Sequence, residues 1–281
     1  MTAGRRAAGL VSRTALVACA LLAACTPGGD PGVRVLPAHD YRPGLQATAH
    51  LPVRTGPAPV VVLVPGGGWV SADPSGLAGL AEHLAAAGAV AVPVEIRAAR
   101  DGVVWPTPVE DVLCALADAA VTSREAGIEP TALVLLGHSS GAHLAALAAL
   151  APHDVHPVCA DPLVVPDALV GLAGPYDVRQ VPEAAVALLG VRPEEDPARW
   201  VAADPLLLAD RRPDLPVLLV HGDADDVVPP AQSRAFDLAL RAAGHPTSLV
   251  VVPGAGHADA YSADVVGDLV AEWVTALGPR R

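Results

Sequence analysis

Lysine is absent from this sequence, and aromatic residues are scarce. All 18 basic residues are arginine and 30 residues are acidic, so the net charge is −12. This excess of negative charge speaks against nucleic acid as a partner. Only 17% of the 281 residues are charged while 52% are hydrophobic, which excludes a disordered acidic chain and a coiled coil. The composition therefore predicts a globular protein with a large apolar core.

Long apolar runs are also missing. Beyond the N-terminus, no stretch reaches the run of about 18 apolar residues that a membrane-spanning helix needs. At the N-terminus, Arg5, Arg6 and Arg13 precede an uncharged apolar run at 15–24, which is too short for a permanent span. A basic segment followed by a short apolar run is typical of an export signal. We therefore predict a signal peptide over residues 1–24 that is removed on export.

The apolar run ends on Leu22-Ala23-Ala24-Cys25, which resembles the lipobox of bacterial lipoproteins. In that motif the cysteine is acylated and becomes the first residue of the mature chain, so the resemblance implies that Cys25 is lipidated. The protein would then face outward on the cell membrane, held by a lipid anchor, with residues 25–44 as a flexible tether. The alternative is an ordinary secretory signal, a secreted protein and an incidental Cys25.

Two cysteines remain once Cys19 is removed with the signal and Cys25 is acylated. They are Cys114 and Cys159. An exported chain with an even number of remaining cysteines allows a disulfide between them. The alternative is a pair of buried thiols, with Cys114 facing the core from a helix.

Valine-rich runs alternate with alanine-rich stretches through most of the chain. Runs typical of buried strands lie at 60–64, 90–94, 133–136, 168–173, 217–220 and 248–252, and candidate helices lie near 75–87, 109–126, 140–151, 230–243 and 262–277. This alternation predicts an α/β fold over residues 45–279, with a mostly parallel central sheet and helices on both faces. The proline-rich segment 175–214 interrupts the pattern, and we expect it to form a small cap or irregular segment over the site.

A GxSxG motif, Gly137-His138-Ser139-Ser140-Gly141, joins a predicted strand to a predicted helix. This is the strand, sharp turn and helix that a nucleophile elbow requires. Its glycines relieve crowding in the turn, and the start of the helix leaves an unpaired N–H at Ser140 beside the serine. We predict that Ser139 is a nucleophile; the alternative is a tight turn without chemistry.

A serine nucleophile needs a base, and the base needs an acid that orients it. An acidic loop with Asp223, Asp225 and Asp226 follows one late strand, and His257 follows the next on a glycine-rich loop. The other histidines near these motifs, His138, His143 and His221, flank the elbow or a strand and are expected to be polar packing residues. His257 is therefore the predicted base.

The loop Pro65-Gly66-Gly67-Gly68-Trp69 follows an early strand. Bare glycine backbone can approach a substrate oxygen closely. We expect the N–H of Gly67 or Gly68, together with that of Ser140, to form an oxyanion hole. The alternative is an ordinary glycine-rich turn between a strand and a helix.

With these motifs in this order, the chain resembles serine esterases and lipases of the α/β-hydrolase superfamily, near the kynurenine formamidase-like branch, over roughly residues 45–277. The glycine loop is similar to the HGGGW loop of that superfamily, with Pro65 in place of the histidine. The HGxxDxxVP pattern places the acid at Asp225, with Asp223 and Asp226 as alternatives. The resemblance also implies a structural pair between Arg97 and Asp111.

The resemblance implies a serine hydrolase that cleaves carboxylic esters through an acyl-enzyme, with Ser139, His257 and Asp225 as the triad. An amide hydrolase of the arylformamidase or peptidase type is the alternative, and a lipid-anchored surface module without activity is a third reading. A small ester or amide is the expected partner. The mechanism requires no cofactor, and because no HExxH or tight Cys/His spacing occurs, no metal site is expected.

Overall fold

The computed structural model describes residues 1–2, 32–54 and 56–278 of the chain. Its centre is an eight-stranded sheet in the order β1-β4-β6-β5-β7-β8-β9-β10. The strands, in that order, are Val33–Val35, His50–Pro52, Val90–Pro93, Ala58–Val64, Pro130–His138, Ala168–Leu172, Val217–Gly222 and Thr247–Val252. A separate two-stranded sheet pairs β2 (His39–Arg42) with β3 (Leu45–Ala47).

The sheet is mostly parallel, as the alternation of strands and helices predicts. From β6 to β10 every neighbouring pair is parallel, whereas β1 and β4 pair antiparallel at one edge. The carboxyl ends of the parallel strands therefore meet on one side of the sheet. Val64, His138, Gly222 and Val252 are the last residues of β5, β7, β9 and β10, and the motif loops start after them.

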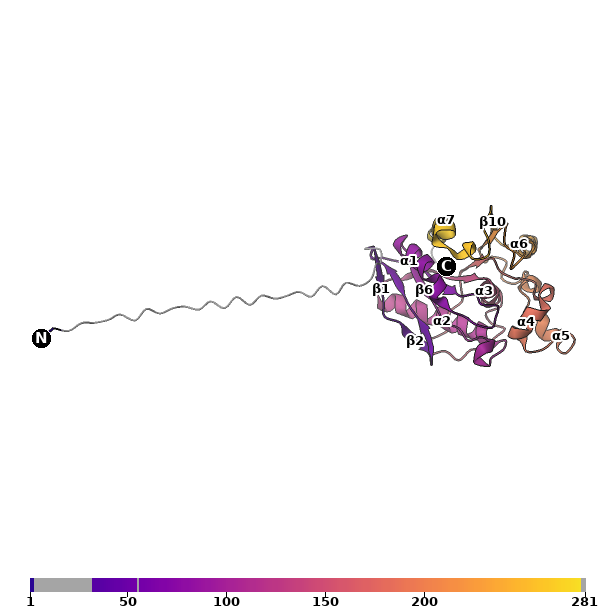
Figure 1. Ribbon diagram of the computed structural model, residues 1–281, viewed down its shortest axis with the longest axis horizontal. Helices are drawn as coiled ribbons and strands as arrows, with labels where there is room; N and C mark the ends of the chain where they lie inside the picture. Colours follow the sequence, from indigo (N-terminus) through magenta and orange to yellow (C-terminus); the bar gives the residue numbers. More distant parts are fainter. Residues whose placement is uncertain (3–31, 55, 279–281) are drawn as a thin grey trace.

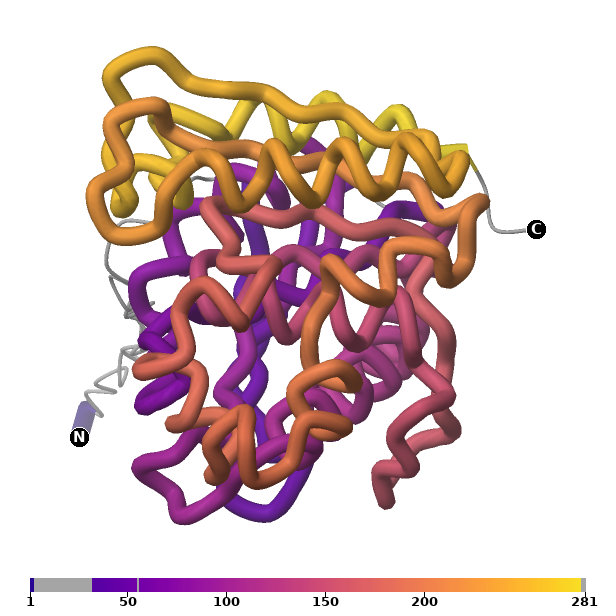
Figure 2. Tube along the Cα trace, turned by 90° about the vertical axis from the view of Figure 1, so that its right-hand side faces the viewer, coloured from indigo at the N-terminus to yellow at the C-terminus, as the bar shows by residue number. Residues whose placement is uncertain are grey.

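Helices cover both faces of the sheet (Figures 1 and 2). Alternate residues of β5 face opposite sides, so Val60, Val62 and Val64 belong to one buried cluster, while Val61 and Leu63 belong to the other. The first cluster includes residues of α2 (Thr107–Glu125), α3 (Ser140–Leu150) and α6 (Ala231–Ala243). The second includes residues of α1 (Ala78–Ala86) and α7 (Ala263–Thr275), which lie near each other at the top of Figure 1.

The predicted tether over 25–44 is too long. Strands β1 and β2 lie inside that range, Tyr41 is buried, and its hydroxyl donates a hydrogen bond to the carbonyl of Glu95. These strands have only three or four residues and no apolar run, so periodicity does not reveal them. Residues 3–24 of the predicted signal peptide, and Cys25, lie outside the described residues.

The proline-rich segment 175–214 folds into short helices, but it does not cover the site. It contains η3 (Val178–Gln180), α4 (Pro182–Leu189), α5 (Pro197–Ala202) and η4 (Pro205–Leu208), with α4 and α5 at the right of Figure 1. Leu188 and Trp200 are buried in the cluster that contains α2 and α3. None of its residues lines the pocket at Ser139. The sequence predicts a small cap or irregular segment; the structure has short helices whose apolar side chains pack into the cluster that contains α2 and α3.

A disulfide joins Cys114 of α2 to Cys159, in the irregular stretch between α3 and β8, with 5.2 Å between the two Cα atoms. Of the two alternatives that the sequence left open, the structure has the bridge. Among the residues that the structure describes, no helix combines the length and the apolar character needed to cross a bilayer.

Candidate active site

Ser139 lies in the sharp turn between β7 and α3, with backbone angles φ 54° and ψ −126°. Residues other than glycine rarely adopt these backbone angles, so the turn is strained. The two glycines of the motif permit it. A Cβ at Gly137 would overlap the carbonyl of Gly141, and a Cβ at Gly141 would overlap the carbonyls of Val64 and Pro65. The motif therefore brings β7, α3 and the end of β5 closer together than larger residues would allow.

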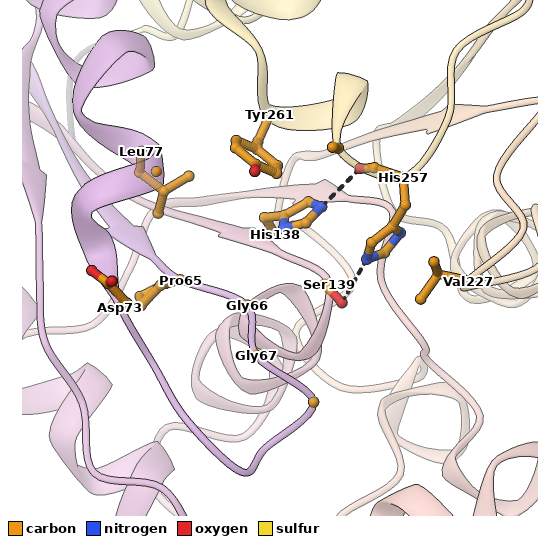
Figure 3. Close-up of a pocket in the computed structure, with 13 residues that line it drawn as sticks. Pro65, Gly66, Gly67, Asp73, Leu77, His138, Ser139, Val227, His257 and Tyr261 are labelled. Carbon is orange, nitrogen blue, oxygen red and sulfur yellow. Dashed lines mark hydrogen bonds between the residues drawn. The ribbon is translucent and has the colours of Figure 1, made fainter.

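Three of the predicted site residues form one hydrogen-bonded chain. His257 Nε2 lies 2.9 Å from Ser139 Oγ, and His257 Nδ1 lies 2.8 Å from Asp225 Oδ2. A carboxylate can only accept, so Nδ1–H donates to Asp225, and Nε2 is left to accept the serine proton. Figure 3 shows the His257 ring directed at Ser139 from the loop after β10. The geometry is that of a nucleophile, a base and an orienting acid.

Asp225 is buried and held by the backbone of its own loop. Its Oδ1 accepts hydrogen bonds from the N–H groups of Val227 and Val228, both at 2.9 Å. Burial alone would raise the pKa of Asp225, but the hydrogen bonds from His257, Val228 and Val227 outweigh it and lower that pKa below its ordinary value. Asp225 is therefore a carboxylate at neutral pH, as the orientation of His257 requires.

The two alternative acids lie elsewhere. Asp223 Oδ1 accepts from the N–H of Gly254 at 2.6 Å, so it fastens the loop that carries His257 to the end of β9. Asp226 is exposed, and within the described residues the His257 ring makes its hydrogen bonds and ion pair with Ser139 and Asp225 rather than with Asp223 or Asp226. Of the three neighbouring aspartates, the structure thus places only Asp225 at His257.

The glycine loop lies beside the serine, and Figure 3 shows Gly66 and Gly67 next to Ser139. Gly67 has φ 139°, and a Cβ there would overlap the carbonyl of Ser71. The carbonyl of Gly67 accepts from the N–H groups of Val70 and Ser71, which closes the loop into a turn. Ser140 is the first residue of α3, so its N–H has no acceptor within the helix. The predicted oxyanion donors therefore lie on two elements that meet at Ser139.

Buried hydrogen bonds fix the far side of this loop. The Trp69 indole N–H donates to His143 Nδ1 at 3.2 Å, and His143 Nε2–H donates to the carbonyl of Ala203 at 2.9 Å. Burial lowers the pKa of His143 to about 4, so the ring stays neutral and can accept from Trp69. His143 is a polar packing residue, as predicted, and it links the glycine loop to the segment 175–214.

His221 has a similar supporting position. Its Nε2 lies 2.9 Å from the carbonyl of Val228 and 3.2 Å from Asp225 Oδ2, and its Nδ1 lies 2.7 Å from Ser233 Oγ. The side chain is fully buried, and burial lowers its pKa. His221 therefore holds the acidic loop against α6.

The predicted pair of Arg97 and Asp111 is confirmed. Arg97 donates from Nη2 to Asp111 Oδ1 at 2.7 Å and from Nε to Oδ2 at 3.0 Å, and Arg42 adds a bond of 2.7 Å to Oδ1. The carboxylate has no exposed side-chain area, so two arginines compensate its burial. Two residues after Arg97, the N–H of Ala99 donates a hydrogen bond to the carbonyl of Trp69 and so supports the glycine loop.

A pocket of about 420 Å³ opens at Ser139. Its walls are mainly apolar or glycine, and its lining residues are Pro65, Gly66, Gly67, Gly68, Asp73, Gly76, Leu77, His138, Ser139, Val227, His257, Ala258 and Tyr261. Sequence reasoning missed Leu77, Asp73 and Val227, because nothing in a single sequence marks which loop residues face a cavity. In the described ranges, no three His, Cys, Asp or Glu side chains are arranged to hold a metal ion.

The comparisons with known proteins agree with this architecture. The chain is 32% identical over 232 residues to esterase LipQ and 34% identical over 220 residues to esterase LipC, both of Mycobacterium tuberculosis. The matches cover 78% and 72% of this chain but only 54% and 53% of those proteins, so the chain spans about half the length of these relatives.

A solved structure of the thermophilic esterase Est2 from Thermogutta terrifontis, with butyrate bound, superposes with a TM-score of 0.71. That match has 23% sequence identity and covers 86% of this chain and 93% of Est2, so it shows the fold. The BD-FAE family model matches residues 50–240, which is more than half of the chain and includes Ser139 and Asp225. The chain therefore belongs to the BD-FAE family and has the α/β-hydrolase fold.

Proposed function

We propose that this protein is a serine hydrolase that cleaves carboxylic esters through an acyl-enzyme. The observation that carries the proposal is the hydrogen-bonded chain from Asp225 through His257 to Ser139, at the mouth of a pocket beside the glycine loop. The relatives named esterases support ester hydrolysis as the reaction class.

In the proposed mechanism, His257 Nε2 accepts the proton of Ser139 while Oγ attacks the ester carbonyl carbon. The negative charge that develops on the carbonyl oxygen is stabilised by the N–H of Ser140 and that of Gly67 or Gly68. His257 then donates the proton to the leaving alcohol as the carbon–oxygen bond breaks. A water molecule, deprotonated by the same imidazole, releases the acid and restores Ser139. Asp225 keeps Nδ1–H of His257 in place throughout.

The pocket favours a small, largely apolar group on the substrate. Leu77, Pro65 and Val227 supply apolar walls, with Leu77 and Pro65 across the pocket from Val227 and the Tyr261 ring next to His138 (Figure 3). A volume of about 420 Å³ accommodates a short acyl or aryl group. We therefore propose short-chain or aryl esters as the substrate class.

The test of the function is the Ser139→Ala variant against an activated short-chain ester. Turnover should fall to background, because no other group supplies the nucleophile, and a fluorophosphonate should label Ser139 in the wild type only. The matched control is Ser248→Ala, which removes an exposed hydroxyl at the start of β10 and should leave turnover unchanged. Undiminished hydrolysis by Ser139→Ala would reject the proposal, and faster turnover of an aryl formamide than of any ester would replace ester with amide hydrolysis.

We also propose that the mature protein is exported and held at the outer side of the cell membrane by acyl chains on Cys25. The support is the Leu22-Ala23-Ala24-Cys25 motif behind a basic and then apolar N-terminus. Since a single acyl chain gives only marginal binding, several chains are expected. In the native host the protein should fractionate with membranes, and Cys25→Ser should release it. An unmodified N-terminus in the mass spectrum of the mature wild type would reject the anchor.

A further inference from the structure

His138 is the last residue of β7 and directly precedes the proposed nucleophile. Its Nε2 lies 3.0 Å from the carbonyl oxygen of His257, and the bond is drawn in Figure 3. A carbonyl oxygen only accepts, so Nε2 must carry the hydrogen and donate it. The backbone of the proposed base is therefore fastened to the residue next to the nucleophile.

The surroundings of His138 keep its ring in this role. His138 is 7% exposed, and the centroid of its ring lies 4.7 Å from that of His257 and 4.4 Å from that of Tyr261. Burial first, and then the neighbouring His257, lower the pKa of His138 to about 4. Asp225 and His221 also act on this pKa, in opposite directions. The ring is thus neutral at the pH where His257 must accept a proton.

Two further side-chain bonds hold the main chain of this loop, and both act on residues before His257. Asp223 holds the N–H of Gly254 at 2.6 Å, and Asp259 holds the N–H of Gly256 at 2.7 Å. Both acceptors belong to the loops after β9 and β10. The bond from His138 instead joins this loop to β7, and a single peptide unit separates His138 from Ser139.

We propose that His138 is a positioning residue for the reaction described above: its Nε2–H fixes the main chain of His257 to β7 and so holds the imidazole in line with Ser139 Oγ. The inference rests on the proposed function. Without this bond the loop after β10 would still have its own hydrogen bonds, but the 2.9 Å contact between His257 Nε2 and Ser139 Oγ would be held less closely. Small displacements of a base reduce its efficiency steeply.

Two substitutions separate the hydrogen bond from the packing. His138→Phe keeps a ring against Tyr261 and removes the donor, whereas His138→Gln keeps an N–H donor of similar reach. We expect His138→Phe to lower kcat and kcat/KM together by about tenfold or more, with KM within about twofold of wild type, because the lost interaction acts in the transition state. His138→Gln should recover most of that loss. Equal loss in both variants at unchanged melting temperature, or full activity of His138→Phe, would overturn the proposal.

The rate at which a fluorophosphonate labels Ser139 provides a second readout, since it depends on the nucleophile, its base and the oxyanion hole but on no later hydrolytic step. Labelling should slow in His138→Phe by the same factor as kcat. Absence of labelling in the wild type would reject the proposed function itself, whereas equally fast labelling in wild type and His138→Phe would reject only the positioning role.

If His138→Phe does not fold, nitrogen-15 NMR of histidine-labelled wild-type protein gives the answer, with His138 assigned by its absence in His138→Gln. The ring should be the neutral Nε2–H tautomer from about pH 8 to 5, given the direction of its pKa shift. A neutral Nδ1–H tautomer would exclude the bond to His257 and overturn the proposal.

Discussion

Aspartates two positions apart have different tasks in this molecule. Asp225 orients His257, while Asp223 accepts from the backbone of Gly254. The sequence assigns the catalytic acid to Asp225 rather than Asp223 only because the spacing from His221 resembles the HGxxDxxVP pattern of the α/β-hydrolases. Residue type alone does not distinguish them, because both follow the same strand and both are acidic.

Asp225→Asn should lower kcat by about 10⁴-fold, since an amide in place of the carboxylate favours the wrong tautomer of His257. Asp223→Asn should cost less than about tenfold, because the amide oxygen can still accept from Gly254. Steady-state kinetics on one activated ester, with melting temperatures for both variants, measure the difference. A larger loss in Asp223→Asn would assign the acid to that residue instead.

Two neighbouring glycines of the oxyanion loop allow a matched test. A Cβ at Gly67 would overlap the carbonyl of Ser71, whereas a Cβ at Gly68 meets open space at φ 62°. Gly67→Ala should displace the loop and reduce kcat by about 10² or more. Gly68→Ala should cost only about 1 kcal/mol of stability from its left-handed backbone. Steady-state kinetics and urea unfolding of both variants measure the two effects. Equal losses of kcat in Gly67→Ala and Gly68→Ala would show that the loop adapts to either side chain.

Among the helices and strands, the sequence predicts those formed by long periodic segments and misses those formed by short ones. Each valine-rich run is a strand of the sheet, because strands buried on both faces need continuous apolar residues. Strands β1 to β4 have three or four residues each and are stabilised by partners far along the chain, such as Glu95 for Tyr41. The placement of 175–214 depends on contacts of Leu188 and Trp200 with distant elements, which local patterns do not encode.

The disulfide ties α2 to the irregular stretch before β8 across a sequence separation of 45 residues. A loop of this length corresponds to about 4 kcal/mol in the chain-entropy model. Reduction, or the Cys114→Ala and Cys159→Ala double variant, should therefore lower the melting temperature while Ser139, on the other end of α3, keeps its activity below that temperature. Calorimetry with and without a reductant measures the shift. Titratable thiols beyond those of Cys19 and Cys25 in the unfolded, unreduced protein would contradict the bridge.

For the whole molecule, buried histidines make stability depend on pH. Burial lowers the pKa of His138 and of His143 to about 4, whereas in the unfolded chain both titrate near 6.5. Between pH 6.5 and 4 the unfolded state binds more protons, so their contribution, about 3 kcal/mol each, is present above pH 6.5 and lost as the pH falls. Asp204 acts oppositely, because burial raises its pKa to about 6 and its protonation favours the folded state.

Burial also lowers the pKa of His50 and His221, whereas it raises that of Asp118 as it does that of Asp204. Four histidines therefore act against two carboxylates, so the free energy of unfolding should decrease from pH 7 to 4.5. His143→Gln can still accept from Trp69 and donate to Ala203, and it should reduce the dependence on pH. Urea titrations of wild type and variant at several pH values measure both slopes. An identical slope in the variant would show that His143 does not titrate as its burial implies.

The strained turn at Ser139 has a consequence for how such a protein can change over generations. With φ 54° and ψ −126°, the nucleophile occupies a conformation that glycine adopts more readily. Ser139→Gly should therefore be about 1 kcal/mol more stable than Ser139→Ala, although both lack the hydroxyl. A substitution that stabilises the fold at this position therefore removes the nucleophile. Only selection for turnover retains serine here, at the cost of a strained backbone.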